Sequence, residues 1–304
     1  MAAQRDTVMR QFPTPLVVGF DGSPASLCAA GAAVDIAERS GSKAHLVTVI
    51  RGGESERGGE GRARRMLRDY TTGLRATQRR LVTEGLRVGD APTEIARVAD
   101  EVDAGLIVVG ASHRTGLAKL LLGSTVESLL QRVPCPLLIL SGDRVAWPPD
   151  EVVIGDDATA EARQAGDLAS EIGALYEAQV TLLEAMPMDG QIAEAASWMG
   201  SVRELFEDRL QDRADDVERA CGSRPTVRLV DGAAARALMA LVGGDRGRRT
   251  LVALGTGGRA GLASVLHPSV ALAVAHGTTG PVLVSPVGDG SVRSADRPRA
   301  SAEG

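Results

Sequence analysis

The chain has 304 residues, a length typical of two domains. Hydrophobic residues make up 44% of it and aromatic residues only 2%, so a globular core must be built from Ala, Val, Leu and Ile. The formal net charge is −5, and neither a basic stripe nor a set of aromatic platforms is visible, which argues against nucleic acid as a partner. No apolar run approaches the ~18 residues that span a bilayer, and no apolar signal segment opens the chain. We therefore expect a cytoplasmic protein without a membrane partner.

The two halves of the chain repeat one series of apolar runs. LVVGFD and VVIGDD each precede an Ala-rich helical pattern and then a second apolar run. Gly19 precedes Gly155 by 136 residues, and Gly110 precedes Gly255 by 145, so order and spacing are nearly conserved between the halves. Such self-similarity indicates a tandem duplication. The paired runs are 16–21 with 152–157, 44–50 with 178–186, 105–116 with 250–261, and 135–141 with 280–286.

Strand-like runs alternate with helix-length segments inside each half. The runs are continuously apolar, as expected of parallel strands whose two faces are both covered by helices. The sequence therefore predicts an α/β fold with two tandem Rossmann-like domains. We place the domains at 1–146 and 147–286, with the Pro-containing linker at 144–151, and we expect the polar segment 287–304 to be a disordered tail.

One segment of the first half has weaker signals. Residues 51–62 are rich in glycine and charge and predict a mobile loop. After this loop, apolar residues recur at helical spacing from about 63 to 84, and this periodicity predicts one helix.

Distinctive residues follow three of the first-half strands. Asp21 and Val49 come at the ends of the first two runs, where a carboxylate and free backbone groups suit a ribose or a base edge. Gly110 follows a later run, where a side chain would block backbone approach. In an open parallel sheet, ligands bind at such strand ends. These residues are therefore candidates for one binding site.

The stretch GASHRTGLAKLLLGST resembles a phosphate-binding loop. Gly123, Ser124 and Thr125 precede a helical pattern, and the free N–H groups of a helix start make an anion seat. Arg114 and Lys119 can neutralise phosphate charge. The alternative is ordinary structure: the glycine and hydroxyl residues cap a helix, Asp21 shapes a turn, and the two cations are solvated.

These residues carry a resemblance to a known family. VVGFDGSPAS, followed by GDAPTEIARVADEVDAGLIVVGASHRTGLAKLLLGSTVESLLQRVPCPLLIL, resembles the universal stress protein family, and the likeness extends over roughly 14–142 and 150–286. The resemblance implies a five-stranded parallel sheet with helices on both faces in each half, of the adenine nucleotide alpha hydrolase-like kind. It also implies ATP as ligand, with magnesium accompanying the phosphates, in members that carry Gly-x2-Gly-x9-Gly-Ser/Thr.

Each half departs from this pattern at a different point. In the first half His113 stands at the second glycine, where it either obstructs the phosphates or donates a hydrogen bond to one. In the second half Gly255 and Gly258 are in place, but Pro268 replaces the third glycine and has no N–H to offer. The residues expected to contact a nucleotide are Phe20, Asp21, Val49, Val109, Gly110, His113, Arg114, Gly123, Ser124 and Thr125 in the first half, and Asp157, Gly255, Gly258 and Ser269 in the second.

Two functions follow from the resemblance. The first is a stress-response regulator that binds ATP or a related adenine nucleotide, mainly in the first half, with at most slow hydrolysis because no general base with an orienting partner is visible. The second is an interaction module with decayed sites that acts through protein partners. An enzyme that adenylates or splits ATP is disfavoured, since FDGSPAS lacks the double glycine of such enzymes and no P-loop is present.

The resemblance also suggests how the halves associate, because sheets of the family often pair through their last strand. CPLLILS and GPVLVSP are the last apolar runs here and can pair with each other within one chain, which would give an intramolecular pseudo-dimer. A true homodimer through other surfaces stays open.

Overall fold

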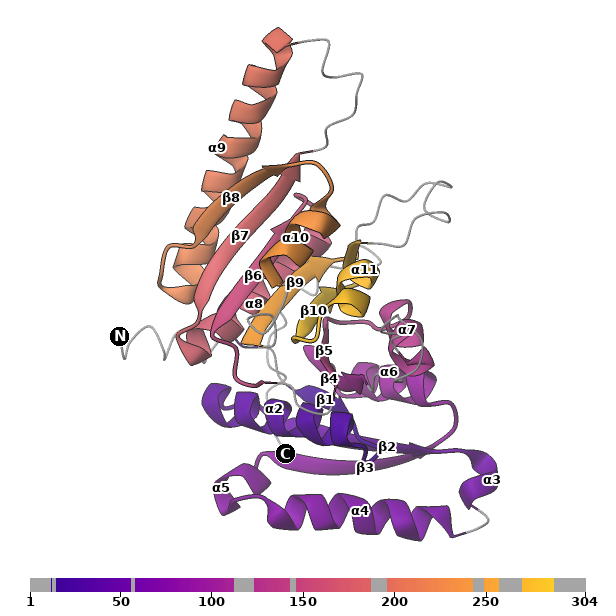
Figure 1. The fold of residues 1–304 in the computed structure, drawn as a ribbon. Helices are drawn as coiled ribbons and strands as arrows, with labels where there is room; N and C mark the ends of the chain where they lie inside the picture. Colours follow the sequence, from indigo (N-terminus) through magenta and orange to yellow (C-terminus); the bar gives the residue numbers. More distant parts are fainter. Residues whose placement is uncertain are drawn as a thin grey trace, which may run out of the picture.

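All ten strands of the described structure form one continuous sheet, which runs from β3 at the bottom of Figure 1 to β8 at the top. The computed structural model describes residues 12, 15–55, 58–111, 123–142, 146–186, 196–242, 249–256 and 270–286. The first half contains β1 (Leu16–Gly19), α2 (Pro24–Ser40), β2 (Ala44–Ile50), α3 (Gly52–Ser55), α4 (Gly59–Gly73), α5 (Ala76–Arg79), β3 (Val82–Val88), α6 (Ala91–Glu101), β4 (Leu106–Ala111), α7 (Ser124–Leu130) and β5 (Leu137–Ser141). The second contains β6 (Glu151–Asp156), α8 (Ala160–Tyr176), β7 (Gln179–Met186), α9 (Ala196–Cys221), β8 (Thr226–Asp231), α10 (Ala234–Val242), β9 (Thr250–Gly255), α11 (Val270–Gly277) and β10 (Val282–Ser285).

Each half contributes five parallel strands in the same order. The sheet runs β3-β2-β1-β4-β5-β10-β9-β6-β7-β8, and the only antiparallel pair among these strands is β5 with β10. In that pair Leu138 lies opposite Leu283, and Ile139 lies opposite Val282. The structure thus confirms the α/β fold with two tandem parallel halves, and it confirms that the last strands of the two halves pair within one chain.

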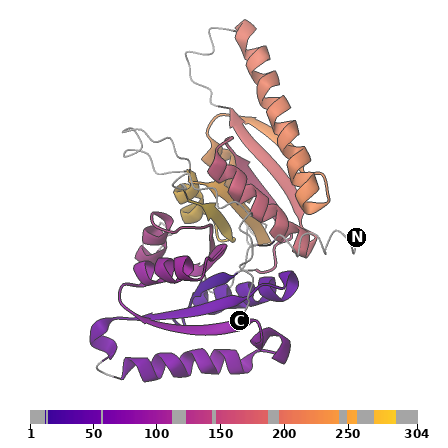
Figure 2. The same ribbon diagram turned by 180° about the vertical axis from the view of Figure 1, so that it is seen from behind.

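Two apolar layers cover the two faces of the sheet. Side chains of α2, α4, α8 and α9 pack on one face, and those of α6, α7, α10 and α11 pack on the other. Figure 2 shows α8 and α9 side by side over the second half. The strands between the layers are buried along almost their whole length, as their uninterrupted apolar sequences predict.

Local sequence signals set the start of the first helix in each half. The Ser23 side chain accepts a hydrogen bond from Ser26 N and caps α2, and Pro24 occupies the first helical position. The Thr159 side chain caps α8 in the same way by accepting from Ala162 N. The two helices therefore begin at equivalent points of the duplicated fold.

The structure corrects two predictions in the first half. The predicted loop at 51–62 contains α3 and the start of α4, which begins at Gly59 rather than near residue 63. The predicted helix does not continue to 84, because α4 ends at Gly73 and β3 begins at Val82. Helical spacing misled here because β3 is an edge strand with both faces partly exposed, so its sequence lacks the continuous apolar run of the central strands.

Side chains also join the halves on both faces of the sheet. The Tyr176 hydroxyl on α8 donates to Asp35 Oδ2 on α2 at 2.7 Å, and it accepts from Trp147 Nε1 in the linker at 3.1 Å. On the opposite face His276 Nε2 of α11 lies 3.6 Å from Glu127 Oε1 of α7. The linker is therefore anchored through Trp147.

In the part of the chain that the structure describes, no helix is long and apolar enough to cross a membrane.

Candidate functional site

The strand order places a topological switch point in each half. β1 lies between β2 and β4. The chain leaves β1 through α2 on one face of the sheet and reaches β4 through α6 on the other. A crevice opens at the carboxyl ends of the strands where such crossovers diverge, and this is the usual ligand site of open α/β sheets. β6 occupies the same position between β7 and β9 in the second half.

Asp21 stands beside this switch point and shapes the turn into α2. Its Oδ1 accepts a hydrogen bond from Ser23 N at 2.9 Å, and its own N–H is 3.3 Å from Ser26 Oγ. Partial burial by itself would raise the pKa of the carboxyl, but the hydrogen bonds from Ser23 and Ser26 outweigh it and the pKa is lowered. Asp21 is therefore an ionised carboxylate that shapes the turn into α2, the role that the sequence had left as one of two alternatives.

Two more of the predicted contacts lie beside Asp21. Val49 is the penultimate residue of β2 rather than its last, and it lies two residues beyond the Gly19–Val47 pair that ends β1. Phe20 is 3% exposed, and its carbonyl accepts from Thr48 Oγ1 at 2.7 Å. The Phe20 ring stands 5.0 Å from that of Tyr70 on α4, so it fills the α2–α4 layer.

Gly110 lets α2 pack closely against β4, a packing role that the sequence had not predicted. An ideal Cβ on Gly110 would lie 2.2 Å from the backbone carbon of Ala25, in the first turn of α2. Gly110 therefore lets α2 start directly against β4. The neighbouring Val109 is buried in the layer formed by α6 and α7. Gly110 is also the penultimate residue of its strand, since β4 continues to Ala111.

The start of α7 has the features of an anion seat. Gly123 is the N-cap residue, with its carbonyl accepting from Val126 N at 2.9 Å and no side chain to satisfy the first amides. An ideal Cβ on Gly123 meets no atom of the described residues within 4 Å. Ser124 and Thr125 follow in the first turn, where backbone N–H groups have no acceptor within the helix. These residues fit a phosphate group chemically. His113, Arg114 and Lys119 lie outside the described residues.

Ser141 is a further polar residue at this edge, and sequence reasoning missed it. It ends β5 and pairs with Ala111 of β4. Its side chain is buried, and its Oγ has no hydrogen-bond partner in the described part of the chain. A lone serine at the end of an apolar run gives no signal in the sequence.

The second half repeats the turn that Asp21 forms at the start of α2. Asp157 Oδ1 accepts from Thr159 N at 3.1 Å, as Asp21 does from Ser23. Gly255 also repeats Gly110, since its ideal Cβ would lie 2.5 Å from Ala162 N on α8. Gly258, Pro268 and Ser269 lie outside the described residues.

This geometry agrees with the result of sequence comparison, in which the model of the universal stress protein family matches residues 14–141 and 149–286. The chain belongs to the universal stress protein family.

Relatives in this family share the sequence at a modest level. Universal stress proteins of Mycobacterium tuberculosis and Mycobacterium bovis are each 28% identical over 197 residues, which is 60% of this chain and 62% of either relative. The match thus spans less than two thirds of those relatives. Among solved structures, a universal stress protein from Archaeoglobus fulgidus superposes with a TM-score of 0.65 at 17% identity, covering 89% of this chain and 97% of that one. A putative universal stress protein from Pseudomonas aeruginosa gives 0.61 at 21%, covering 91% and 94%. These structures show the same fold.

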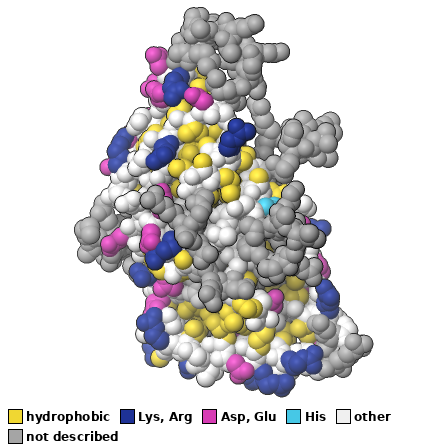
Figure 3. Space-filling model, in the orientation of Figure 1, with side chains coloured by type: hydrophobic (Ala, Val, Ile, Leu, Met, Phe, Trp, Pro, Cys, Tyr) yellow, Lys and Arg dark blue, Asp and Glu magenta, His cyan; other side chains and the backbone are white. Residues whose placement is uncertain are grey.

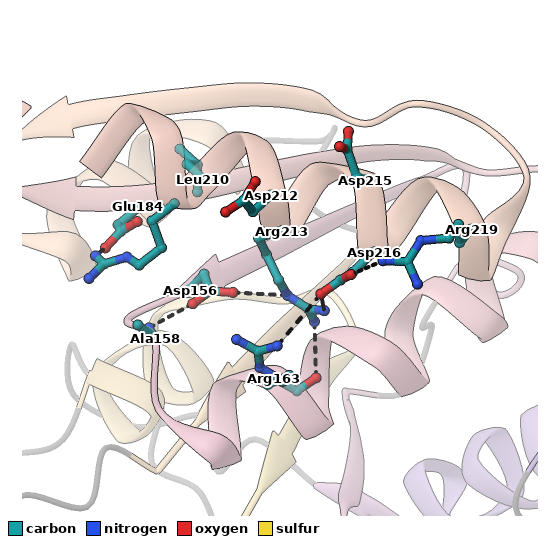
Figure 4. Close-up of a pocket in the computed structure, with 11 residues that line it drawn as sticks. Asp156, Ala158, Arg163, Glu184, Leu210, Asp212, Arg213, Asp215, Asp216 and Arg219 are labelled. Carbon is teal, nitrogen blue, oxygen red and sulfur yellow. Dashed lines mark hydrogen bonds and ion pairs between the residues drawn. The ribbon is translucent and has the colours of Figure 1, made fainter. Parts of the chain in front are cut away.

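Within this universal stress protein fold, the second half carries an ionic cluster that sequence reasoning missed. Arg213 of α9 is 5% exposed, and its Nε lies 3.1 Å from Asp156 Oδ2 at the end of β6. The same guanidinium contacts Asp167 Oδ1 at 2.8 Å and donates to the Arg163 carbonyl at 3.1 Å. Figure 4 shows the contacts of Arg213 with Asp156 and with the Arg163 carbonyl, in a cavity of about 430 Å³ beside α9. The alternation of Arg and Asp along α9 was the available signal, but charge runs of this kind usually face solvent.

The cluster replaces an apolar contact of the first half. Asp156 occupies the place of Phe20, because each is the residue before one of the equivalent aspartates, and Arg213 of α9 contacts Asp156 as Tyr70 of α4 contacts Phe20. Gly166 makes room for the arginine, since its ideal Cβ would lie 2.8 Å from an Arg213 terminal nitrogen.

Across the described ranges, no group of three or more His, Cys, Asp or Glu side chains is arranged to hold a metal ion.

Proposed function

We propose that this universal stress protein binds an adenine nucleotide, with ATP as the expected ligand, in its first half and acts as a regulator in a stress response. The observation that carries the proposal is the carboxyl edge of the first-half sheet, where β1, β2 and β4 end and where α7, which leads into the parallel strand β5, begins. The Asp21 carboxylate and the first-turn amides of Ser124 and Thr125, which have no acceptor within the helix, belong to this edge.

Each residue type in the proposed site suits one part of a nucleotide. Ser124 and Thr125 offer N–H and hydroxyl donors for phosphate oxygens. Asp21 keeps an ionised carboxylate for a ribose hydroxyl or an adenine amino group. The backbone of Val49 extends past the end of β1, where a base edge can pair with it. Bound ATP would supply the charge and the ring that these groups recognise.

The second half is a weaker candidate. Asp157 and Gly255 repeat their first-half equivalents, but Pro268 removes a donor at the position of Gly123. We therefore propose one nucleotide for each chain, held by the first half.

The experiment is to denature the purified protein, identify any released nucleotide, and titrate ATP into the stripped protein by calorimetry. We expect about one adenine nucleotide per chain. Gly123→Val should weaken ATP binding by at least about tenfold by crowding the anion seat, and the variant should fold because no atom of the described residues lies within 4 Å of the Cβ position. Gly31→Val, on the exposed side of α2 with equal space, is the matched control. The absence of both released nucleotide and binding heat would overturn the proposal.

That outcome would favour the second candidate function, an interaction module without nucleotide. The observation behind it is the substitution pattern, with His113 and Pro268 each replacing a glycine of the family motif. His113→Gly separates the two explanations of His113. Tighter ATP binding in this variant would mean that the histidine obstructs the site, and weaker binding would mean that it contacts the phosphates.

A further inference from the structure

A second cavity lies in the first half, between the start of α2 and helix α4. Its volume is about 420 Å³, within the ~300–1,000 Å³ range of small-molecule sites. In Figure 3 hydrophobic side chains gather between these two helices, with Lys and Arg side chains beside them on the α4 side. The cavity belongs to the sheet face covered by α2 and α4, whereas α7, whose first turn is the proposed phosphate seat, packs on the opposite face.

The floor of the cavity is apolar and aromatic. Phe20 and Tyr70 meet with their rings tilted by 46°, and Met66 lies against Gly22, whose ideal Cβ would be 2.5 Å from the Met66 sulfur. Leu27 stands at the side of the cavity with 43% of its surface exposed. Thioether and aromatic groups together adapt to flat or flexible apolar ligands.

The charged side chains of this cavity lie at its rim. Arg62 and Arg65 line the cavity from α4 together with a single acid, Asp69, which leaves one net positive charge. Arg65 is exposed, and no ion pair of its side chain occurs among the described residues. This balance suits a monoanion better than a triphosphate, which would need more cationic partners.

The Tyr70 hydroxyl provides a polar contact at the floor. It lies in a half-buried side chain, and no hydrogen bond to it is formed within the described ranges. Burial raises the pKa of this phenol to about 12, so it stays protonated and can donate.

The second half shows that the fold does not require an apolar floor here. At the equivalent place Asp156 and Arg213 form a buried ion pair, and Arg209, one turn before Arg213 as Met66 is before Tyr70, pairs with Glu184. One scaffold therefore supports either an ionic cluster or an open apolar cavity, and only the first half keeps the cavity apolar.

We propose that the cavity between α2 and α4 binds a small amphipathic anion, an aromatic or alkyl carboxylate or sulfonate, at a site separate from the nucleotide. Its apolar body lies on Phe20, Met66 and Tyr70. Its anionic group pairs with Arg65, with Arg62 adding to the local positive potential. The proposal does not depend on nucleotide binding in the same half.

The test uses two fluorescent dyes of similar shape on the full chain: anilinonaphthalene sulfonate, which is anionic, and phenylnaphthylamine, which is neutral. The anionic dye should saturate a single site per chain. Arg65→Ala should weaken it by about tenfold, the usual effect of removing a charge-assisted contact, and leave the neutral dye within about twofold. Arg64→Ala, an exposed arginine of the same helix outside the cavity, is the control and should change neither.

A second variant tests the apolar floor of the cavity. Met66→Arg introduces the residue type that the second half has at this place, and it should abolish binding of both dyes while circular dichroism shows an intact fold. Unchanged affinity of the anionic dye in Arg65→Ala or in Met66→Arg would overturn the proposal. Competitive displacement of the dye by ATP would also overturn it, because the cavity would then be part of the nucleotide site. Failure of ATP to bind at all, with dye binding intact, would affect only the proposed function.

Discussion

At the scale of single residues, the duplicated fold keeps a turn and changes what surrounds it. Asp21 and Asp157 each accept a hydrogen bond from the residue two positions later and lead into a helix capped by that residue. Gly110 and Gly255 each let that helix approach a neighbouring strand. These positions are retained because the backbone path depends on them. A nucleotide is not needed to explain them.

The first prediction concerns the two glycines of the first-half motif. Gly110→Ala should lower the free energy of unfolding by about 2 kcal/mol, because the new methyl group meets the Ala25 backbone, which cannot move without shifting α2. Gly123→Ala should change stability by only ~0.5 kcal/mol or less, since no atom in the described part of the chain lies within 4 Å of its Cβ position. Urea unfolding measures both. Equal destabilisation by the two changes would contradict this account of Gly110.

The second prediction concerns the buried ion pair of the second half. Arg213→Ala should destabilise the protein by about 3 kcal/mol, because it leaves Asp156 charged and nearly buried without its partner. The double variant Asp156→Phe with Arg213→Tyr installs the first-half pair and should recover at least half of the loss. Chemical denaturation is the measurement. A double variant as unstable as the single one would show that the halves do not tolerate exchange of these contacts.

At the scale of elements, α8 contacts α9 through a row of charged side chains along one side of the helix. Arg163 and Asp167 lie one turn apart and both meet α9, where they contact Asp216 and Arg213. Glu171 follows one more turn along the helix. Burial, and secondarily the charge of Asp167, raises the pKa of the Glu171 carboxyl to about 8.

The third prediction is a pH dependence that follows from Glu171. The folded protein holds this proton more tightly than the unfolded chain, so stability is lost as pH rises from about 4.5 to about 8. Glu171→Gln stays neutral and should raise Tm near pH 8 while changing it little near pH 4.5. Glu204→Gln, an exposed change on α9, is the control. Thermal melts in which Glu171→Gln has the same effect at both pH values would disprove the raised pKa.

At the scale of the whole molecule, one chain builds what resembles a dimer of half-chains. β5 is fully buried because β10 covers its outer edge, and Tyr176 and His276 add contacts on the two faces beside that seam. An uncovered edge strand with such an apolar sequence is a template for pairing with another chain.

The fourth prediction follows from this seam. A fragment of residues 1–146, which lacks β10, should self-associate through β5 into a dimer, measured as molecular mass by light scattering after size-exclusion chromatography. The intact chain, whose β5 edge is occupied, is the control for association through other surfaces. A fragment that remains monomeric at all concentrations would contradict the prediction.

The sequence by itself determined the duplication and the parallel central strands, and the family resemblance suggested the pairing of 135–141 with 280–286. The duplication and the parallel strands depend on continuous apolar runs and their spacing, which are local signals that tertiary contacts reinforce. The same signals failed at 63–84, because an edge strand lacks the apolar run that identifies a central one. They also left Asp21 and Gly110 ambiguous, since a turn and a ligand site require the same residue types.

Only the tertiary structure decided what lies beside the switch points. Arg213 and Asp156 are 57 positions apart, and Phe20 and Tyr70 are 50 apart, so no pattern along the chain shows that each pair meets. Whether an arginine in a charged helix faces water or a buried carboxylate depends on which face that helix turns toward the sheet. That orientation is set by the packing of α9 against α8 and β7, and it gives the two halves different cavities on the same fold.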